Sequence, residues 1–214
     1  MLLSTLIRTL NMNKKERNML SNLSGVFFLS GFSALTYQVA WQRLLFTGFG
    51  VDLTSITVIV SVFMAGLGIG AFFGGRIADA APKATLKIFC FIELMIGLFG
   101  LFSREAITWL QNQMIHADLF PSAMAIFALL LIPTFFMGAT LPLLTTFFNQ
   151  YIKNIGSSIG SLYFFNTLGA AIGAFATGFL LFNHFTLSQT IHIAAGINLF
   201  IATILFVMYG IKKQ

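Results

Sequence analysis

The chain has 214 residues, of which 57% are hydrophobic and only 8% are charged, and its mean hydropathy is +0.90. Soluble domains carry charge on about a quarter of their residues, so this composition excludes an ordinary soluble protein and indicates an integral membrane protein. Its twelve basic residues exceed its six acidic ones, which in a membrane protein marks one side of the bilayer rather than a nucleic-acid partner. The single cysteine, Cys90, allows no intrachain disulfide.

The first 22 residues precede any apolar run long enough to cross a membrane. Their order, a short apolar stretch followed by basic residues, is the reverse of that in a secretory signal peptide. We expect a retained cytoplasmic segment, either an amphipathic helix lying along the inner leaflet or a frayed tail that carries topogenic charge. The apolar stripe of such a helix would comprise Leu2, Leu3, Leu6, Ile7 and Leu10.

Six later runs are apolar and long enough to cross about 30 Å of hydrocarbon as helices. The predicted fold is therefore an all-α polytopic membrane protein, with one six-helix domain over residues 23–210 and a cytoplasmic tail over 211–214. The first, fourth and fifth runs exceed the length that a perpendicular helix needs, which allows them to tilt. The predicted spans are 23–49, 53–75, 86–103, 121–147, 156–182 and 188–210.

The basic residues that flank these spans are unevenly distributed. Flanking Lys and Arg residues stay on the cytoplasmic side far more often than not. With both termini in the cytoplasm, ten of the twelve fall on that side, while Arg104 falls on the other and Arg43 lies inside the first span. We therefore expect cytoplasmic termini. The ten are Arg8, Lys14, Lys15, Arg17, Arg76, Lys83, Lys87, Lys153, Lys212 and Lys213.

The outer part of the first span combines aromatic, amide and basic side chains. A spacing of four places Tyr37 with Trp41, and Gln38 with Gln42, on adjoining helix faces. One interpretation is anchoring at the membrane interface, which we favour for Trp41 and Arg43. The other is a vestibule in which the two aromatic rings face a cationic or flat solute while the two amides orient it, and we favour this interpretation for Gln38.

Small residues form a stripe on the second span, and the fifth span repeats it. Such stripes let helix backbones approach closely, so they predict tight packing against another helix. Residues 69–75 of the second span and 172–178 of the fifth also echo each other. A 3+3 inverted repeat would explain the echo, because these spans cross in opposite directions, but Gly, Ala and Phe are common enough here for a chance match. The stripes contain Gly66, Gly70 and Gly74 in the second span and Gly169 and Gly173 in the fifth.

Glu93 is the one carboxylate that we expect deep in the membrane. It lies about seven positions into the third span, roughly 10 Å from its cytoplasmic end, where a carboxylate facing lipid would cost several kcal/mol. It must therefore face protein or water. Two interpretations stand beside each other: a carboxylate that binds a proton or cation, and a protonated or hydrogen-bonded acid that joins helices.

The fourth and fifth spans carry further polar or helix-breaking residues. Pro133 and Pro142 each free a carbonyl group one turn back, which predicts kinks and allows a broken-helix binding site. Asn166 lies near mid-depth, where interhelical hydrogen bonding is the default and contact with a solute is the alternative. His184 and His192 lie near the outer boundary without a carboxylate at ligand spacing, so we expect no metal site and no cofactor.

Four stretches carry a family resemblance: SGFSALTYQVAWQRLL (30–45), FMAGLGIG (63–70) running on to GRIAD (75–79), MGATLPLL (137–144), and 160–171 with its NTLGAA. In this order on four spans, they resemble the membrane portion of a bacterial family of fused major-facilitator-like and spermidine-synthase-like proteins. The resemblance implies half of a major-facilitator fold in a bacterial inner membrane. Arg76 and Asp79 look like the facilitator loop whose aspartate and nearby bases latch cytoplasmic helix ends, although residues 80–83 depart from that signature.

The resemblance also sets expectations for function. Family members commonly carry a soluble aminopropyltransferase-like domain, and residues 1–214 show neither its glycine-rich nucleotide loop nor its acidic pair, so we expect no spermidine synthesis by this chain alone. The first hypothesis is a module that transports or presents a small cationic or amine-bearing solute, as a homodimer through the glycine stripes or with a cytoplasmic synthase-like subunit. The alternative is an anchor or scaffold for a separate soluble aminopropyltransferase- or methyltransferase-like enzyme.

Overall fold

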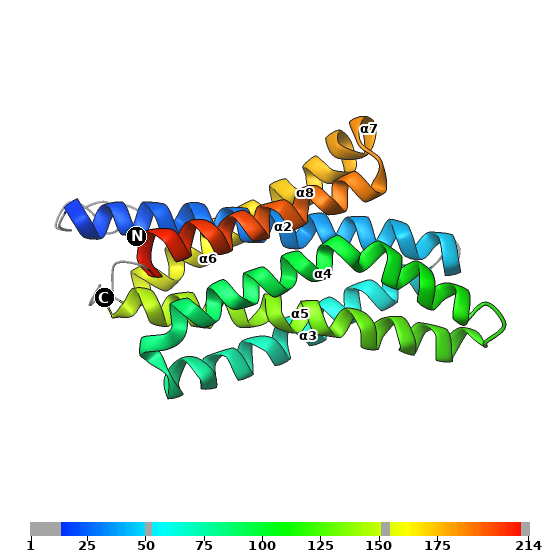
Figure 1. The fold of residues 1–214 in the computed structure, drawn as a ribbon, viewed down its shortest axis with the longest axis horizontal. Coiled ribbons are helices and arrows are strands. Elements are labelled where there is room, and N and C mark those ends of the chain that lie inside the picture. Colours follow the sequence, from blue (N-terminus) through cyan, green and yellow to red (C-terminus); the bar gives the residue numbers. More distant parts are fainter. Residues whose placement is uncertain (1–13, 50–52, 151–154, 211–214) are drawn as a thin grey trace.

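The computed structural model describes residues 14–49, 53–150 and 155–210, which form helices joined by short turns and include no strand (Figure 1). The predictions for residues before 14 and for the tail after 210 lie outside this described part. The six long helices are α2 (Lys14–Phe49), α3 (Leu53–Ala80), α4 (Thr85–Gln113), α5 (Leu119–Asn149), α6 (Ile155–Ala176) and α8 (Leu187–Leu205).

All six predicted spans are confirmed as helices long and apolar enough to cross a membrane. The bounds differ most in the first and third. Helix α2 begins at Lys14, well before the predicted start at residue 23, and α4 continues to Gln113 instead of ending near residue 103. The prediction stopped the third span at the charged pair Arg104 and Glu105, but both side chains are exposed and do not interrupt the helix.

The connections between the helices have local causes. Helix α3 is followed by the short 3-10 helix η1 (Pro82–Ala84), which leads directly into α4. Before α8, the chain makes a capping box: the Gln189 backbone N–H donates to Thr186 Oγ1, and the Thr186 backbone N–H donates to Gln189 Oε1. The described chain starts and ends at the same end of the bundle (Figure 1), as six crossings require.

Helix α5 passes through both of its prolines without a break. The hydroxyl of Thr134, next to Pro133, donates back to the carbonyl oxygen of Leu130 at 2.8 Å. The broken-helix binding site that Pro133 and Pro142 suggested is therefore not formed. Irregular turns occur elsewhere, in the π-helical segments η2 (Thr177–Leu181), which continues α6 toward the short α7 (Phe182–His184), and η3 (Phe206–Gly210), which continues α8.

The most extensive helix contacts join α3 to α5 and α2 to α6, and glycines lie at both contacts. A Cβ atom on Gly70 would lie less than 3.0 Å from the carbonyl oxygen of Phe135, and a Cβ atom on Gly169 equally close to that of Phe28. The helix backbones therefore touch, as close packing in lipid requires. The stripes are used within one chain, so their interpretation as the contact surface for a second copy is wrong. The other stripe glycines, Gly66, Gly74 and Gly173, also face a neighbouring helix of the same chain.

The two glycine contacts are built in the same way. In each, a second glycine lies on the partner helix: Gly138 of α5 meets the carbonyl group of Leu67, and Gly31 of α2 meets that of Asn166. Leu67 lies three positions before Gly70, and Asn166 lies three positions before Gly169. Exchanging α2, α3 and α4 with α5, α6 and α8 therefore maps one contact onto the other, as a 3+3 inverted repeat predicts.

This exchange aligns Gly70 with Gly169. The sequence echo instead pairs Gly70 with Gly173, one helical turn away. Because glycines recur every four residues in both stripes, a shift of one turn preserves much of the sequence match, and sequence alone could not choose the register. The third helices of the two halves, α4 and α8, contact each other, with Leu199 of α8 packed against Gly97 of α4.

A substitution in the α3 stripe tests this packing. Gly70→Ala should destabilise the protein by about 1–3 kcal/mol, because the new methyl group meets backbone atoms of α5 that cannot rotate away. Gly68→Ala, on the same helix with nothing within 4 Å of the added Cβ, should leave stability unchanged or raise it slightly. Unfolding in mixed detergent micelles measures both, and equal effects at the two positions would contradict the backbone contact.

Candidate functional site

The carboxyl group of Glu93 lies inside the bundle. Glu93 is roughly 12 Å along the axis of α4 from Thr85, at 1.5 Å per residue. Its side chain is 0% exposed, so the expectation that it faces protein or water instead of lipid is confirmed, with protein on every side. It is the only charged side chain that is buried among the described residues.

Two neutral side chains from other helices hold this carboxyl group. Ser30 Oγ of α2 donates to Glu93 Oε1 at 2.8 Å, and Asn198 Nδ2 of α8 donates to Glu93 Oε2 at 2.6 Å. Both partners are buried. Within the described ranges no basic side chain forms an ion pair with Glu93, and the five basic residues whose side chains are described are all exposed. The site therefore joins α2, α4 and α8 around an acid that has no countercharge.

Two buried polar atoms near this site lack a hydrogen-bond partner among the described residues. They are Asn198 Oδ1 and the hydroxyl oxygen of Tyr37. Tyr37 lies two turns after Ser30 on α2, and its hydroxyl occupies the space that a side chain on Gly100 of α4 would fill. Each such atom costs about 1–3 kcal/mol. Ser24 Oγ and Asn149 Oδ1 are also without a partner, so two of the four such atoms of the described residues lie near the buried acid.

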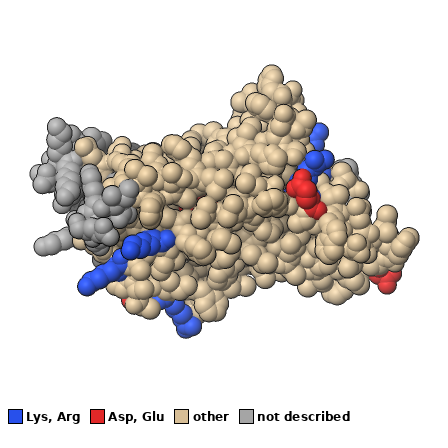
Figure 2. Space-filling view, viewed as in Figure 1, with Lys and Arg blue, Asp and Glu red and all other residues tan. Residues whose placement is uncertain are grey.

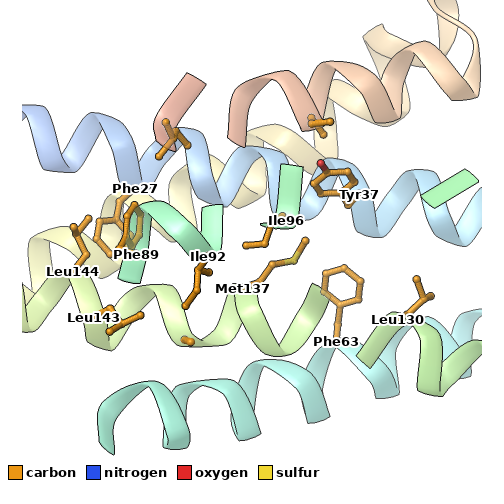
Figure 3. Packing of buried hydrophobic residues seen from close by; sticks show 14 of the residues in the cluster. Phe27, Tyr37, Phe63, Phe89, Ile92, Ile96, Leu130, Met137, Leu143 and Leu144 are labelled. Carbon is orange, nitrogen blue, oxygen red and sulfur yellow. The ribbon is translucent and has the colours of Figure 1, made fainter. Parts of the chain in front are cut away.

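Tyr37 and Trp41 form a closed aromatic cluster. Their rings stack with centroids 4.8 Å apart, and Trp41 Nε1 donates to Ser103 Oγ of α4 at 2.9 Å. Figure 3 shows Tyr37 and Phe63 within the surrounding apolar cluster. Both Tyr37 and Trp41 are 0% exposed, which means that no water-sized space touches them. Trp41 is therefore not an interfacial anchor, and the two rings do not line the vestibule that their spacing suggested.

The other predicted site residues of α2 and α6 lie apart from Glu93. Gln38 and Gln42 are half-buried, and no hydrogen bond in the described structure joins either of them or Asn166 to Glu93. Asn166 is half-buried and lies against Gly31 at the contact between α2 and α6. Arg43 is exposed, with its guanidinium carbon 4.5 Å from the ring centroid of Phe182, which agrees with a position at the edge of the bundle.

Arg76 and Asp79 lie at the exposed end of α3. The guanidinium carbon of Arg76 is 4.3 Å from the ring centroid of Phe72, and the described residues contain no ion pair at Arg76 or Asp79. A different contact joins this end of the bundle: the side-chain amide of Gln150, just after α5, donates to the carbonyl oxygen of Pro82. The helix ends therefore meet here through a neutral hydrogen bond.

Sequence reasoning missed Ser30 and Asn198 as partners of Glu93. Asn198 is an amide within the apolar run of the last span, and such a residue inside a membrane helix is itself a signal of an interhelical hydrogen bond. Ser30 carries no comparable signal, because serine is common in membrane helices and can bond to its own backbone. Only the crossing of α2 over α4 brings its hydroxyl to the acid.

Cavities lined by the described residues lie outside this site. One, of about 460 Å³, opens between the C-terminal ends of α2 and α4 and the N-terminal end of α5 and is lined in part by Thr47, Gln111 and Ser122. Another, of about 480 Å³, lies between α2 and α6 and is lined mainly by apolar residues with Ser24. Neither includes Glu93. No protein family, curated protein or solved structure matches the chain.

The position of Trp41 can be measured by fluorescence. The protein has two tryptophans, and Trp109 is exposed while Trp41 is enclosed. In the Trp109→Phe variant, the emission of Trp41 should resist both iodide and brominated lipid, because neither quencher can contact its ring. In the Trp41→Phe variant, Trp109 should be quenched by at least one of them. Strong quenching of Trp41 by brominated lipid would restore the anchoring interpretation.

Proposed function

We propose that this protein is a membrane transport module for a small cationic or amine-bearing solute, with Glu93 neutralising the positive charge of the solute. The supporting observation is the complete burial of a carboxyl group at the junction of three helices without a basic side chain beside it. Acids inside membrane proteins are costly and are typical of ion and solute pathways. The chain offers no second buried charge among its described residues for this task.

The packing of the helices supports movement around this acid. Backbone contacts at the glycines hold α3 to α5 and α2 to α6 as close pairs. Around Glu93, hydrogen bonds join α4 to Ser30 of α2 and to Asn198 of α8, and such bonds can exchange partners at lower cost than the backbone contacts at the two glycine pairs. Opening would therefore separate the α2, α4 and α8 junction and keep each glycine pair intact. A second copy of the chain would supply the other half of a facilitator-like assembly.

The family resemblance directs the choice of solute and of membrane. Its spermidine-synthase-like members point to polyamines and related amines as the first solutes to examine, in a bacterial inner membrane. Exposed basic residues lie at the α3–α4 connection, and the exposed pair Arg104 and Glu105 lies toward the far end of α4. The charges are therefore close to the two ends of the bundle, and Figure 2 shows the uncharged middle of one face. With the basic connection in the cytoplasm, both termini lie there as well.

Thiol labelling tests this orientation. Lys83→Cys, at the connection before α4, should react with a membrane-impermeant maleimide only from the cytoplasmic side, whereas Glu105→Cys should react only from the opposite side. The native Cys90 is buried and provides an unreactive background. The reverse pattern of labelling would overturn the proposed orientation without affecting the number of spans.

Glu93→Gln tests the proposed role of the acid. Purified protein in proteoliposomes loaded with unlabelled amine should exchange it for external labelled tetramethylammonium or spermidine. Glu93→Gln should lower this exchange by about 100-fold or more, because a buried opposite charge contributes about 3–5 kcal/mol. The variant should still fold, since a glutamine amide can accept from Ser30 and, after the Asn198 amide turns over, donate to Asn198 Oδ1.

Glu105→Gln is the matched control, because Glu105 is an exposed acid on the same helix. It should exchange amines at the wild-type rate. Absence of exchange for every amine in the wild-type protein, with its helices intact by circular dichroism, would remove the transport proposal.

A scaffold role is the second candidate, and one observation favours it. Both oxygens of Glu93 already accept hydrogen bonds, so the acid can join three helices without any solute. Exposed Lys83 and Lys87 would then offer charges to a soluble synthase-like or methyltransferase-like enzyme. Co-purification of such an enzyme in constant stoichiometry, lost on Lys83→Glu with Lys87→Glu and accompanied by no amine exchange, would establish this alternative.

A further inference from the structure

Glu93 needs a countercharge when no solute is bound. The acid is the only buried charged side chain of the described residues, and its hydrogen-bond partners, Ser30 and Asn198, are neutral. If a cationic solute binds there and leaves, the carboxylate loses its countercharge in a low-dielectric site. An uncompensated buried charge costs several kcal/mol, so a second positive species must neutralise the acid when the solute is absent.

Asn198 provides an independent observation. Its side chain is 2% exposed, and its Oδ1 atom has no partner within the described structure while Nδ2 donates to Glu93 Oε2 at 2.6 Å. The two ends of an amide have nearly the same shape, so turning the group over places Oδ1 against the carboxyl group. Two oxygen atoms at that distance repel each other unless a proton lies between them or one metal cation binds both of them.

We propose that Glu93, Asn198 and Ser30 form a site for a small inorganic cation, Na⁺ or a proton, and that this cation exchanges with the solute. The inference rests on the proposed transport function. Hard cations take oxygen ligands, and these side chains offer both carboxyl oxygens, one amide oxygen and one hydroxyl oxygen from α4, α8 and α2. In the proton form, Glu93 Oε2 carries the hydrogen and donates it to Asn198 Oδ1. Release of that proton to water restores the carboxylate, which again accepts from Nδ2.

The described residues of the neighbouring helices supply no alternative countercharge. Tyr37 of α2 and Cys90 of α4 lie close enough to interact electrostatically with Glu93, but neither can carry a positive charge. Helix α5 has no titratable side chain in its sequence, and the histidine of α8, His192, is exposed. Because one carboxylate neutralises one positive charge, the inorganic cation and a monovalent solute must occupy the site in turn. The protein is therefore an exchanger.

Proteoliposomes containing the full chain test this exchange, with tetramethylammonium as the probe because it carries one fixed charge and cannot cross as a neutral base. One set of vesicles has a tenfold outward Na⁺ gradient at constant pH, and another has a tenfold outward proton gradient at constant Na⁺. A potassium ionophore with equal K⁺ on both sides clamps the membrane potential. One of the two gradients should drive up to about tenfold accumulation of the probe, the limit for one-for-one exchange.

The outcomes separate this inference from the proposed function. Accumulation driven by Na⁺ alone or by the proton gradient alone identifies the cation and supports the exchange. If the protein exchanges amine for amine but neither gradient makes the probe accumulate, the inference is overturned and the transport proposal is kept. Failure of both measurements overturns transport, and the inference with it.

A variant of Asn198 tests the amide directly. Asn198→Leu has a similar size but no oxygen ligand, and it should lose gradient-driven accumulation at least tenfold more than it loses amine-for-amine exchange. Thr190→Val is the matched control, because Thr190 is buried on the same helix and donates only to the carbonyl oxygen of Thr186. Equal loss of both activities in Asn198→Leu would show that the Asn198 amide has only a structural role. If this variant does not fold, the two gradients applied to the wild-type protein still decide the inference.

Discussion

Backbone contact at glycine residues is the interaction on which the rest of this bundle depends. Apolar side chains gain little by leaving lipid for a protein interior, so helices in a membrane associate through close van der Waals packing. Gly70 and Gly169 bring α3 against α5 and α2 against α6 until backbone atoms touch. Helices α4 and α8 then link the two pairs, since α4 also packs on α5 and α8 on α2. The position of every polar group in the centre follows from this arrangement.

Glu93 lies where these linking helices meet α2. The surrounding cluster is apolar, and among the described residues only Ser30 and Asn198 donate hydrogen bonds to the oxygens of the enclosed acid. A bundle selected for stability alone would replace such a group by a hydrophobic one, because burying a charge without a countercharge is unfavourable. Asn198 Oδ1 and the hydroxyl of Tyr37 add unpaired polar atoms to the same region. Local departures from optimal stability of this kind are concentrated at functional sites, which is the physical basis of the transport and exchange proposals.

Two sequence interpretations were wrong. The residue type and position of Trp41 are typical of an interfacial anchor, and prolines inside a membrane helix are typical of a broken helix. In the fold, Trp41 turns inward to stack on Tyr37 and bond to Ser103, and α5 stays continuous where Thr134 bonds back to its own helix. Residue spacing shows which side chains share a helix face. It does not show whether that face meets lipid or another helix.

The sequence by itself determined the membrane class, six spans, the depth of Glu93 and the presence of two small-residue stripes, because hydropathy and helical periodicity act over a few turns of one segment. The family expectations and the choice between transport and scaffold roles depend on residues whose function cannot be read from local sequence patterns. Tertiary structure alone decided that the stripes pair within one chain, in a register one turn from the sequence echo, and that Ser30 and Asn198 bind Glu93. Those contacts join residues far apart in the chain, and packing between helices, which spacing within one helix does not encode, sets the distances between them.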